Sequence, residues 1–80
     1  MKGPTMFRTV HRTVLPGFRN YGYEVRQDGE AIETGEIVNT GNLATVRPTD
    51  GQRRPPILWY HTEREALQAL ARERNAIYVG

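Results

Sequence analysis

Three arginines lie close together in the stretch RPTDGQRRPP, which covers residues 47 to 56. Arginine presents a planar fork of N–H donors that suits phosphates, carboxylates and aromatic faces. The prolines around these arginines restrict the backbone, so less entropy is lost when the side chains engage a partner. We therefore take Arg47, Arg53 and Arg54 as the main candidates for partner binding. The alternative is that this stretch is only the polar tip of a hairpin.

Two further arginines recur at helical spacing. Arg64, Gln68 and Arg72 are four residues apart, so on a helix they form one polar stripe away from Leu67 and Leu70. Glutamates are interleaved with these arginines, and this favours an ordinary solvated face over a binding stripe. Arg64 and Arg72 are therefore secondary candidates for partner binding.

Residues for catalysis and metal binding are scarce. The chain has no cysteine, no serine and two histidines, which excludes a Ser or Cys nucleophile. His11 is expected at the surface, and His61 is expected to be a partly buried structural residue bonded to the backbone. The sequence has no HxH, HxxxH, calcium-loop or phosphate-loop spacing. We therefore predict a protein that is not an enzyme, with no cofactor and no metal site.

Composition predicts one small, soluble domain. The 80 residues form a single domain, 1–80, whose core is small. The formal net charge of +2 is only weakly basic, although every basic residue except Lys2 is an arginine. The absence of cysteine and of a long apolar stretch fits a cytoplasmic protein that does not enter a membrane.

A β-hairpin is the clearest local pattern. Residues 21–35, YGYEVRQDGEAIETG, alternate around Asp28-Gly29, the residue pair of a two-residue turn. A regular register sets Val25 opposite Ile32 on one face. On the other face it sets Glu24 opposite Glu33, and we expect that face to be wet.

The remaining elements follow from apolar periodicity and from capping signals. We predict a strand over 6–15, two strands over 42–47 and 57–62 joined by the proline-rich loop, and a helix over 61–75. Thr62 and Glu65 form a capping box at the start of the helix, and Asn75 can end it in the left-handed conformation. Residues 76–80 have strand character, and either add an edge strand or pack over the helix end.

These elements predict an α+β fold. It is a mostly antiparallel, twisted sheet of about four to five strands with one amphipathic helix packed on one face. Tyr21, Tyr23, Trp59 and Tyr60 either fill the core under the helix or stack bases on the open face of the sheet.

The hairpin GYEVRQDGEAIETG, followed by an aromatic strand and TEREALQALARERN, resembles AP2-like and integrase arm-type DNA-binding domains. In those families the sheet enters the major groove, so the resemblance implicates Arg26 and its strand neighbours. This chain departs from the pattern by its long segment over residues 39–56. It also carries on the hairpin carboxylates that repel phosphate, namely Glu24, Glu30, Glu33 and Glu36.

The small size, the mixed-sign arginine-rich surface and the lack of a catalytic set resemble the small inhibitors of phages and mobile elements, such as anti-CRISPR proteins. This is a resemblance of kind, without a shared motif. Our leading hypothesis is a binding module that presents arginines to an acidic protein surface or nucleoprotein complex and blocks it. A small DNA-binding protein is the alternative, and the sequence leaves the oligomeric state open.

Overall fold

The computed structural model describes residues 7–17, 21–49 and 58–80. In chain order its elements are β1 (Arg8–Val14), β2 (Tyr21–Gln27), β3 (Glu30–Thr40), β4 (Leu43–Pro48), α1 (Glu63–Glu73) and β5 (Ile77–Tyr78). The α+β class and the single helix are confirmed for these residues, and the predicted number of strands matches.

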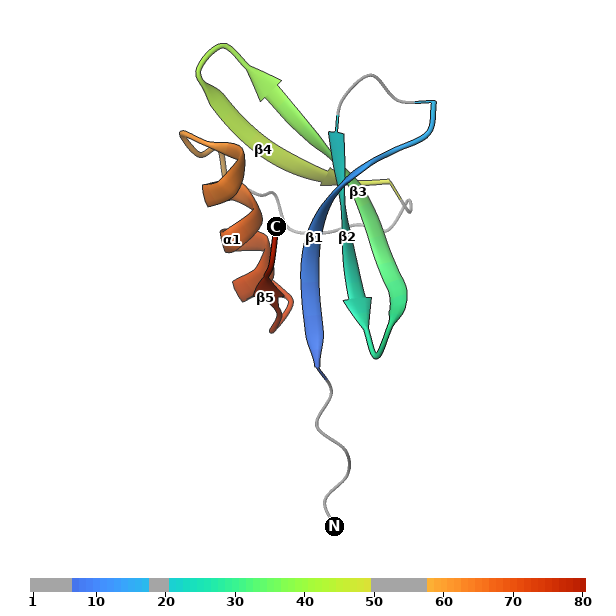
Figure 1. Ribbon diagram of the computed structural model, residues 1–80. Coiled ribbons are helices and arrows are strands. Elements are labelled where there is room, and N and C mark those ends of the chain that lie inside the picture. The colour runs from blue at the N-terminus through green and yellow to red at the C-terminus, as the bar shows by residue number, and fades with distance from the viewer. Residues whose placement is uncertain (1–6, 18–20, 50–57) are drawn as a thin grey trace.

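The five strands form one sheet in the order β4-β3-β2-β1-β5. The pairings β1–β2, β2–β3 and β3–β4 are antiparallel, and β5 pairs parallel with β1. The sheet curls into a half-barrel, so that the strands at its two edges, β4 and β5, both come to lie beside α1 (Figure 1). The helix therefore packs between the two edges of the curled sheet as well as against β1.

The β2–β3 hairpin has the predicted turn but a different register. Asp28 and Gly29 have φ values of 53° and 86°, as a two-residue turn of this type requires. Beyond Arg26, paired with Ala31, the register shifts by one residue, and Val25 lies opposite Glu33. The predicted pairing of Val25 with Ile32 is therefore wrong.

The cause of this shift is a β-bulge, in which one extra residue on β3 is left without a partner. The bulge turns the side chain of Ile32 out to solvent, where it is 47% exposed, and turns Glu33 into the core, where it is 6% exposed. The prediction that Glu24 and Glu33 face each other on a wet face is also wrong, since Glu24 pairs with Thr34. A one-residue change of register moves every following side chain to the other face of the strand.

The second hairpin joins β3 to β4 through a turn at residues 41 and 42, with Gly41 at φ 59°. The sequence predicted a hairpin between residues 42–47 and 57–62 instead, and a strand over 57–62 is wrong for its described part. There, Tyr60 makes one isolated bridge with Ala44. The strand β3 is 11 residues long and continues through Gly35, a residue that usually interrupts a strand.

Gly35 is tolerated in β3 because Tyr23 covers it. The two residues are paired across β2 and β3, and a Cβ atom at Gly35 would collide with the ring of Tyr23. The ring thus occupies the space that the glycine leaves, and its hydroxyl reaches Glu33 at 2.7 Å.

The helix begins and ends as its sequence predicts. The Thr62 hydroxyl accepts a hydrogen bond from the Glu65 N–H at 3.1 Å, and the Glu65 carboxylate accepts one from the His61 N–H at 3.2 Å. Asn75 has a φ of 55°, the left-handed conformation common after a helix.

The core lies between the inner face of the sheet and α1. Its larger fully buried side chains are Val10, Tyr23, Val25, Ile37, Leu67 and Leu70. Of the two predicted roles of residues 76–80, the edge strand is correct. Nowhere in the described ranges is a helix sufficiently long and apolar to cross a membrane.

Candidate partner-binding surface

Most of the described arginines are bound to other residues of the chain. Ion pairs hold Arg12 to Glu63 at 2.9 Å, Arg26 to Glu24 at 3.0 Å, Arg47 to Glu36 at 2.9 Å, and Arg74 to Glu33 at 2.8 Å. Arg8 donates to the side chain of Gln27 and to the carbonyl of Arg74. A partner that engaged one of these arginines would have to compete with its intramolecular contact.

The register of β3 and β4 places Arg47, one of the three main candidates, directly opposite Glu36. The side chain of Arg47 remains 68% exposed, but a carboxylate of the same sheet already binds its guanidinium. The other two main candidates, Arg53 and Arg54, lie outside the described residues and stay a prediction.

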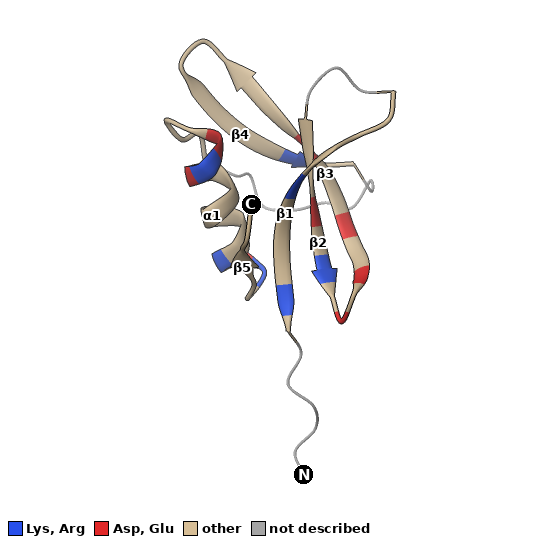
Figure 2. Ribbon diagram, viewed as in Figure 1, with Lys and Arg blue, Asp and Glu red and all other residues tan. Residues whose placement is uncertain are grey.

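The secondary candidates, Arg64 and Arg72, are both exposed on α1. Neither makes an ion pair or a side-chain hydrogen bond with another residue in the described part of the chain. Basic residues lie toward both ends of α1, and acidic residues occupy its first turn (Figure 2). The structure thus separates arginines that neighbouring groups hold from arginines that are available to a partner.

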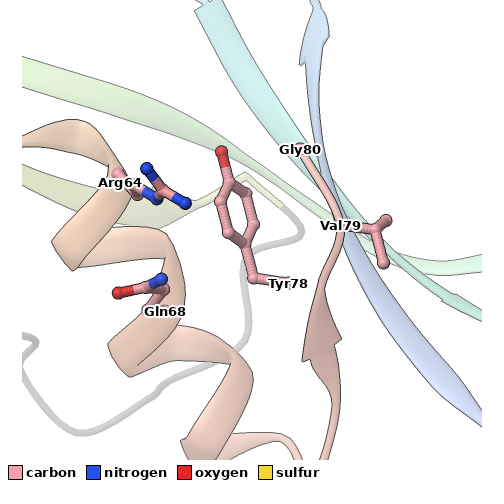
Figure 3. A pocket seen from close by; sticks show the side chains of 5 residues that line it. All are labelled: Arg64, Gln68, Tyr78, Val79 and Gly80. Carbon is pink, nitrogen blue, oxygen red and sulfur yellow. The ribbon is translucent and has the colours of Figure 1, made fainter.

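A hollow lies between α1 and the C-terminal segment. We call it the α1–β5 hollow, and its walls are Arg64, Gln68, Tyr78, Val79 and Gly80. Arg64 and the hydroxyl end of Tyr78 face each other across the hollow, Gln68 lies one helical turn below Arg64, and the side chain of Val79 points away from the helix (Figure 3). The three polar side chains of the hollow, those of Arg64, Gln68 and Tyr78, can all donate hydrogen bonds.

A second hollow lies on the other side of Gln68. We call it the Trp59 hollow, and it is lined by Trp59, Tyr60, His61, Glu65, Gln68 and Arg72. Trp59 is 47% exposed, whereas its neighbour Tyr60 packs against the core. The two hollows adjoin at Gln68, so together they form one continuous surface across the exposed face of α1.

The two histidines make different contacts in the described residues. His61 is exposed and only its backbone N–H makes the contact with Glu65, so the prediction of a partly buried, backbone-bonded ring is wrong. The Nε2 atom of His11 lies 2.8 Å from the Thr9 hydroxyl. No cluster of three or more His, Cys, Asp or Glu side chains that could hold a metal ion occurs within residues 7–17, 21–49 and 58–80.

The sequence pointed to the helix arginines and to Trp59 as an aromatic that could contact a partner, but it did not place Trp59 beside these arginines and did not point to Tyr78. Tyr78 comes from a two-residue strand, and Trp59 comes from a segment that was predicted to be part of the sheet. The curl of the sheet brings Tyr78 of β5 beside α1, and no local pattern in the sequence signals this position.

Comparison with known proteins adds no relative: no protein-family model matches the chain, and no significant match was found among curated proteins or solved structures.

Proposed function

We propose that this protein is a non-enzymatic binding module that docks the exposed face of α1 on an acidic surface of a protein or nucleoprotein complex and blocks it. The inhibitory part of this proposal rests on the resemblance of kind to anti-CRISPR proteins. The proposal sets this interaction in the cytoplasm, as the composition predicts.

The observation that supports the proposal is that some arginines have a polar partner within the chain and others do not. Arg64 and Arg72 are exposed and have no polar partner among the described residues, whereas Arg26 and Arg47 are neutralised by carboxylates. An arginine without an intramolecular partner gains a full charge-assisted hydrogen bond when it meets a carboxylate. A paired arginine exchanges one such bond for another, so it contributes less to affinity.

The outer face of the sheet is the competing surface. If the sheet is a mostly antiparallel, twisted layer with the helix on one face, its other face is open to a partner. The charged pairs Glu24–Arg26 and Glu36–Arg47 lie on strands of this sheet and are already matched internally. Charge complementarity therefore favours the helix side for an acidic partner.

Acidic neighbours favour a protein partner over nucleic acid. Glu65 lines the Trp59 hollow, and Glu73 follows Arg72 directly on α1. A continuous phosphate backbone would approach these carboxylates, whereas a protein surface can place single carboxylates opposite Arg64 and Arg72 only. On the hairpin that the DNA-binding resemblance implicates, Arg26 is held by Glu24.

A matched pair of double variants tests the proposal. R64Q/R72Q removes the two unpartnered arginines, and R26Q/R47Q removes the same charge from two paired ones. We expect the parent and R26Q/R47Q to retain the same partner in quantitative affinity capture, and R64Q/R72Q to lose it by about tenfold or more in affinity, because central arginine contacts are worth about 2 kcal/mol.

Two results would contradict the proposal. One is a partner that R64Q/R72Q binds as well as the parent does. The other is tight binding of labelled single- or double-stranded DNA that weakens steeply between about 50 and 200 mM salt, since this is the signature of phosphate contacts and would support the DNA-binding alternative.

A further inference from the structure

We infer that the surface across α1 binds a short peptide segment in which a carboxylate side chain and an aromatic side chain lie close together. This inference rests on the proposed function and names the chemistry of the partner. The carboxylate occupies the α1–β5 hollow, and the aromatic ring occupies the Trp59 hollow.

The α1–β5 hollow carries the donor set that a carboxylate needs. Arg64 supplies a planar fork of N–H groups, Tyr78 supplies a hydroxyl, and Gln68 supplies an amide, all on the walls of the same hollow (Figure 3). An ionised carboxylate is an acceptor only, with two oxygens that can take a bidentate guanidinium and further donors. No Asp or Glu side chain of the described residues lines this hollow.

The Trp59 hollow has a different character. Trp59 and Tyr60 provide aromatic surface beside the guanidinium of Arg72, and an aromatic side chain can stack on both kinds of group. Glu65 stands in the wall of this hollow and repels a second carboxylate. The occupant of the Trp59 hollow is therefore a neutral ring rather than an acid.

Gln68 joins the two sites, because it lines both hollows. Side chains of one short peptide can consequently enter both at once, with the peptide crossing α1 over Gln68. A single-stranded nucleic acid also combines rings with negative charge, but phosphates flank each of its bases. Its backbone would bring negative charge toward Glu65. The structure therefore favours a peptide that places its carboxylate in the α1–β5 hollow and no charge in the Trp59 hollow.

An NMR titration of the full chain tests this inference. The probe is an acetylated and amidated peptide of five residues, with an aspartate and a tryptophan separated by one glycine and a glycine at each end. We expect millimolar peptide to shift the backbone amides of Arg64, Gln68, Arg72 and Tyr78. A peptide with asparagine for aspartate, and one with alanine for tryptophan, should each bind about tenfold more weakly.

Gln68→Glu is the sharpest variant, because it is isosteric, lies on an exposed position and adds a negative charge beside both hollows. We expect it to weaken the peptide about tenfold, while Asn42→Asp, the same chemical change in the exposed β3–β4 turn, leaves binding unchanged. Tyr78→Phe removes only the hydroxyl and should weaken the aspartate peptide but not the asparagine peptide.

The inference is overturned if the aspartate and asparagine peptides bind alike, if no amide near Gln68 shifts, or if a trinucleotide binds more tightly than the peptide. Spectra of the free variants show whether each is folded. If R64Q/R72Q loses the captured partner but the peptide shifts no amide of the parent, this inference is wrong and the proposed function still holds.

Discussion

Glu33 is a carboxylate that folding places in the core. Its oxygens accept hydrogen bonds from the Tyr23 hydroxyl at 2.7 Å and from the Nε and a terminal nitrogen of Arg74 at 2.8 and 3.2 Å. Arg8 in turn donates to the carbonyl of Arg74. A buried charge is tolerated when it is paired and hydrogen-bonded in this way, and it is costly when its partner is removed.

Glu33→Gln tests this arrangement at the residue scale. The amide keeps the shape but removes the buried counter-charge of Arg74 and leaves only the exposed carboxylate of Glu73, 3.8 Å away. We therefore expect the free energy of unfolding to fall by about 2 to 4 kcal/mol. Urea unfolding followed by circular dichroism measures the loss. Glu24→Gln is the matched control, since it breaks an exposed pair with Arg26 and should cost less than about 1 kcal/mol. Equal losses in the two variants would show that Glu33 is not a buried partner.

The hydrogen bond with Glu33 raises the pKa of Arg74 above its ordinary value, although burial acts in the opposite direction. A cation whose pKa is raised by folding adds stability that is fully present below its ordinary pKa and is lost only as the pH rises through the raised value. The contribution of Arg74 is therefore complete at neutral pH.

At the scale of elements, the sequence correctly predicted those features of the helix, turns and strands that depend on neighbouring residues. The capping residues of α1, the Asp28-Gly29 turn and the strands over β1 and β4 all follow from a few neighbouring residues. The bulge in β3 does not, because Ile32 is apolar and Glu33 is charged, and both argue for the opposite orientation. Arg74, distant in sequence, and the hydroxyl of Tyr23 on the neighbouring strand make an inward Glu33 favourable.

Substitutions of two isoleucines of β3 test this register. Ile32→Thr should change the free energy of unfolding by no more than about 0.5 kcal/mol, because the bulge leaves this side chain half exposed. Ile37→Thr places a hydroxyl at a fully buried position and should cost about 2 kcal/mol or more. Chemical denaturation of both variants gives the comparison. The regular register expected from the sequence pairs Ile32 with the buried Val25, so it predicts a large loss in the free energy of unfolding for Ile32→Thr as well. That result would contradict the bulge.

The candidate site, like the sheet, could be predicted only in part from the sequence. The helical spacing of Arg64, Gln68 and Arg72 was enough to place them on one exposed stripe. Which arginines are neutralised was not predictable, because the contact of Arg47 with Glu36 depends on how β3 pairs with β4. The proline-rich stretch therefore drew attention to Arg47, whereas the unpartnered arginines of the described residues lie on the helix.

At the scale of the whole molecule, α1 links strands that are not neighbours in the sheet. Glu63, the first residue of the helix, accepts from Arg12 of β1 at 2.9 Å and from Asn39 of β3 at 2.8 Å. At the sheet edge, the Val79 N–H donates to the Val10 carbonyl and the Arg12 N–H donates to the Gly80 carbonyl. These contacts hold the curled sheet around the helix and form one wall of the α1–β5 hollow.

Val79→Pro tests the edge pairing of the C-terminal segment. Proline removes the N–H that binds Val10, so we expect a loss of about 1 to 2 kcal/mol and a fall in Tm of roughly 5 to 10 °C for a domain of this size. Val79→Ala is the control, because the side chain is half exposed and the N–H remains. Differential scanning calorimetry measures both variants, and an equal Tm for the two would exclude a stabilising role of this bond.

The parallel pairing of β5 with β1 also has a consequence for the order of folding. Thr9 pairs with Ile77 and Val10 with Tyr78, so this contact joins positions near opposite ends of the described chain, whereas the β2–β3 and β3–β4 hairpins close over short turns. Loop-closure entropy and contact order then make the hairpins early events and the β1–β5 contact a late one. During synthesis, one edge of β1 stays unpaired until residues 77–79 emerge, and this is when the nascent chain is most exposed to wrong strand pairing.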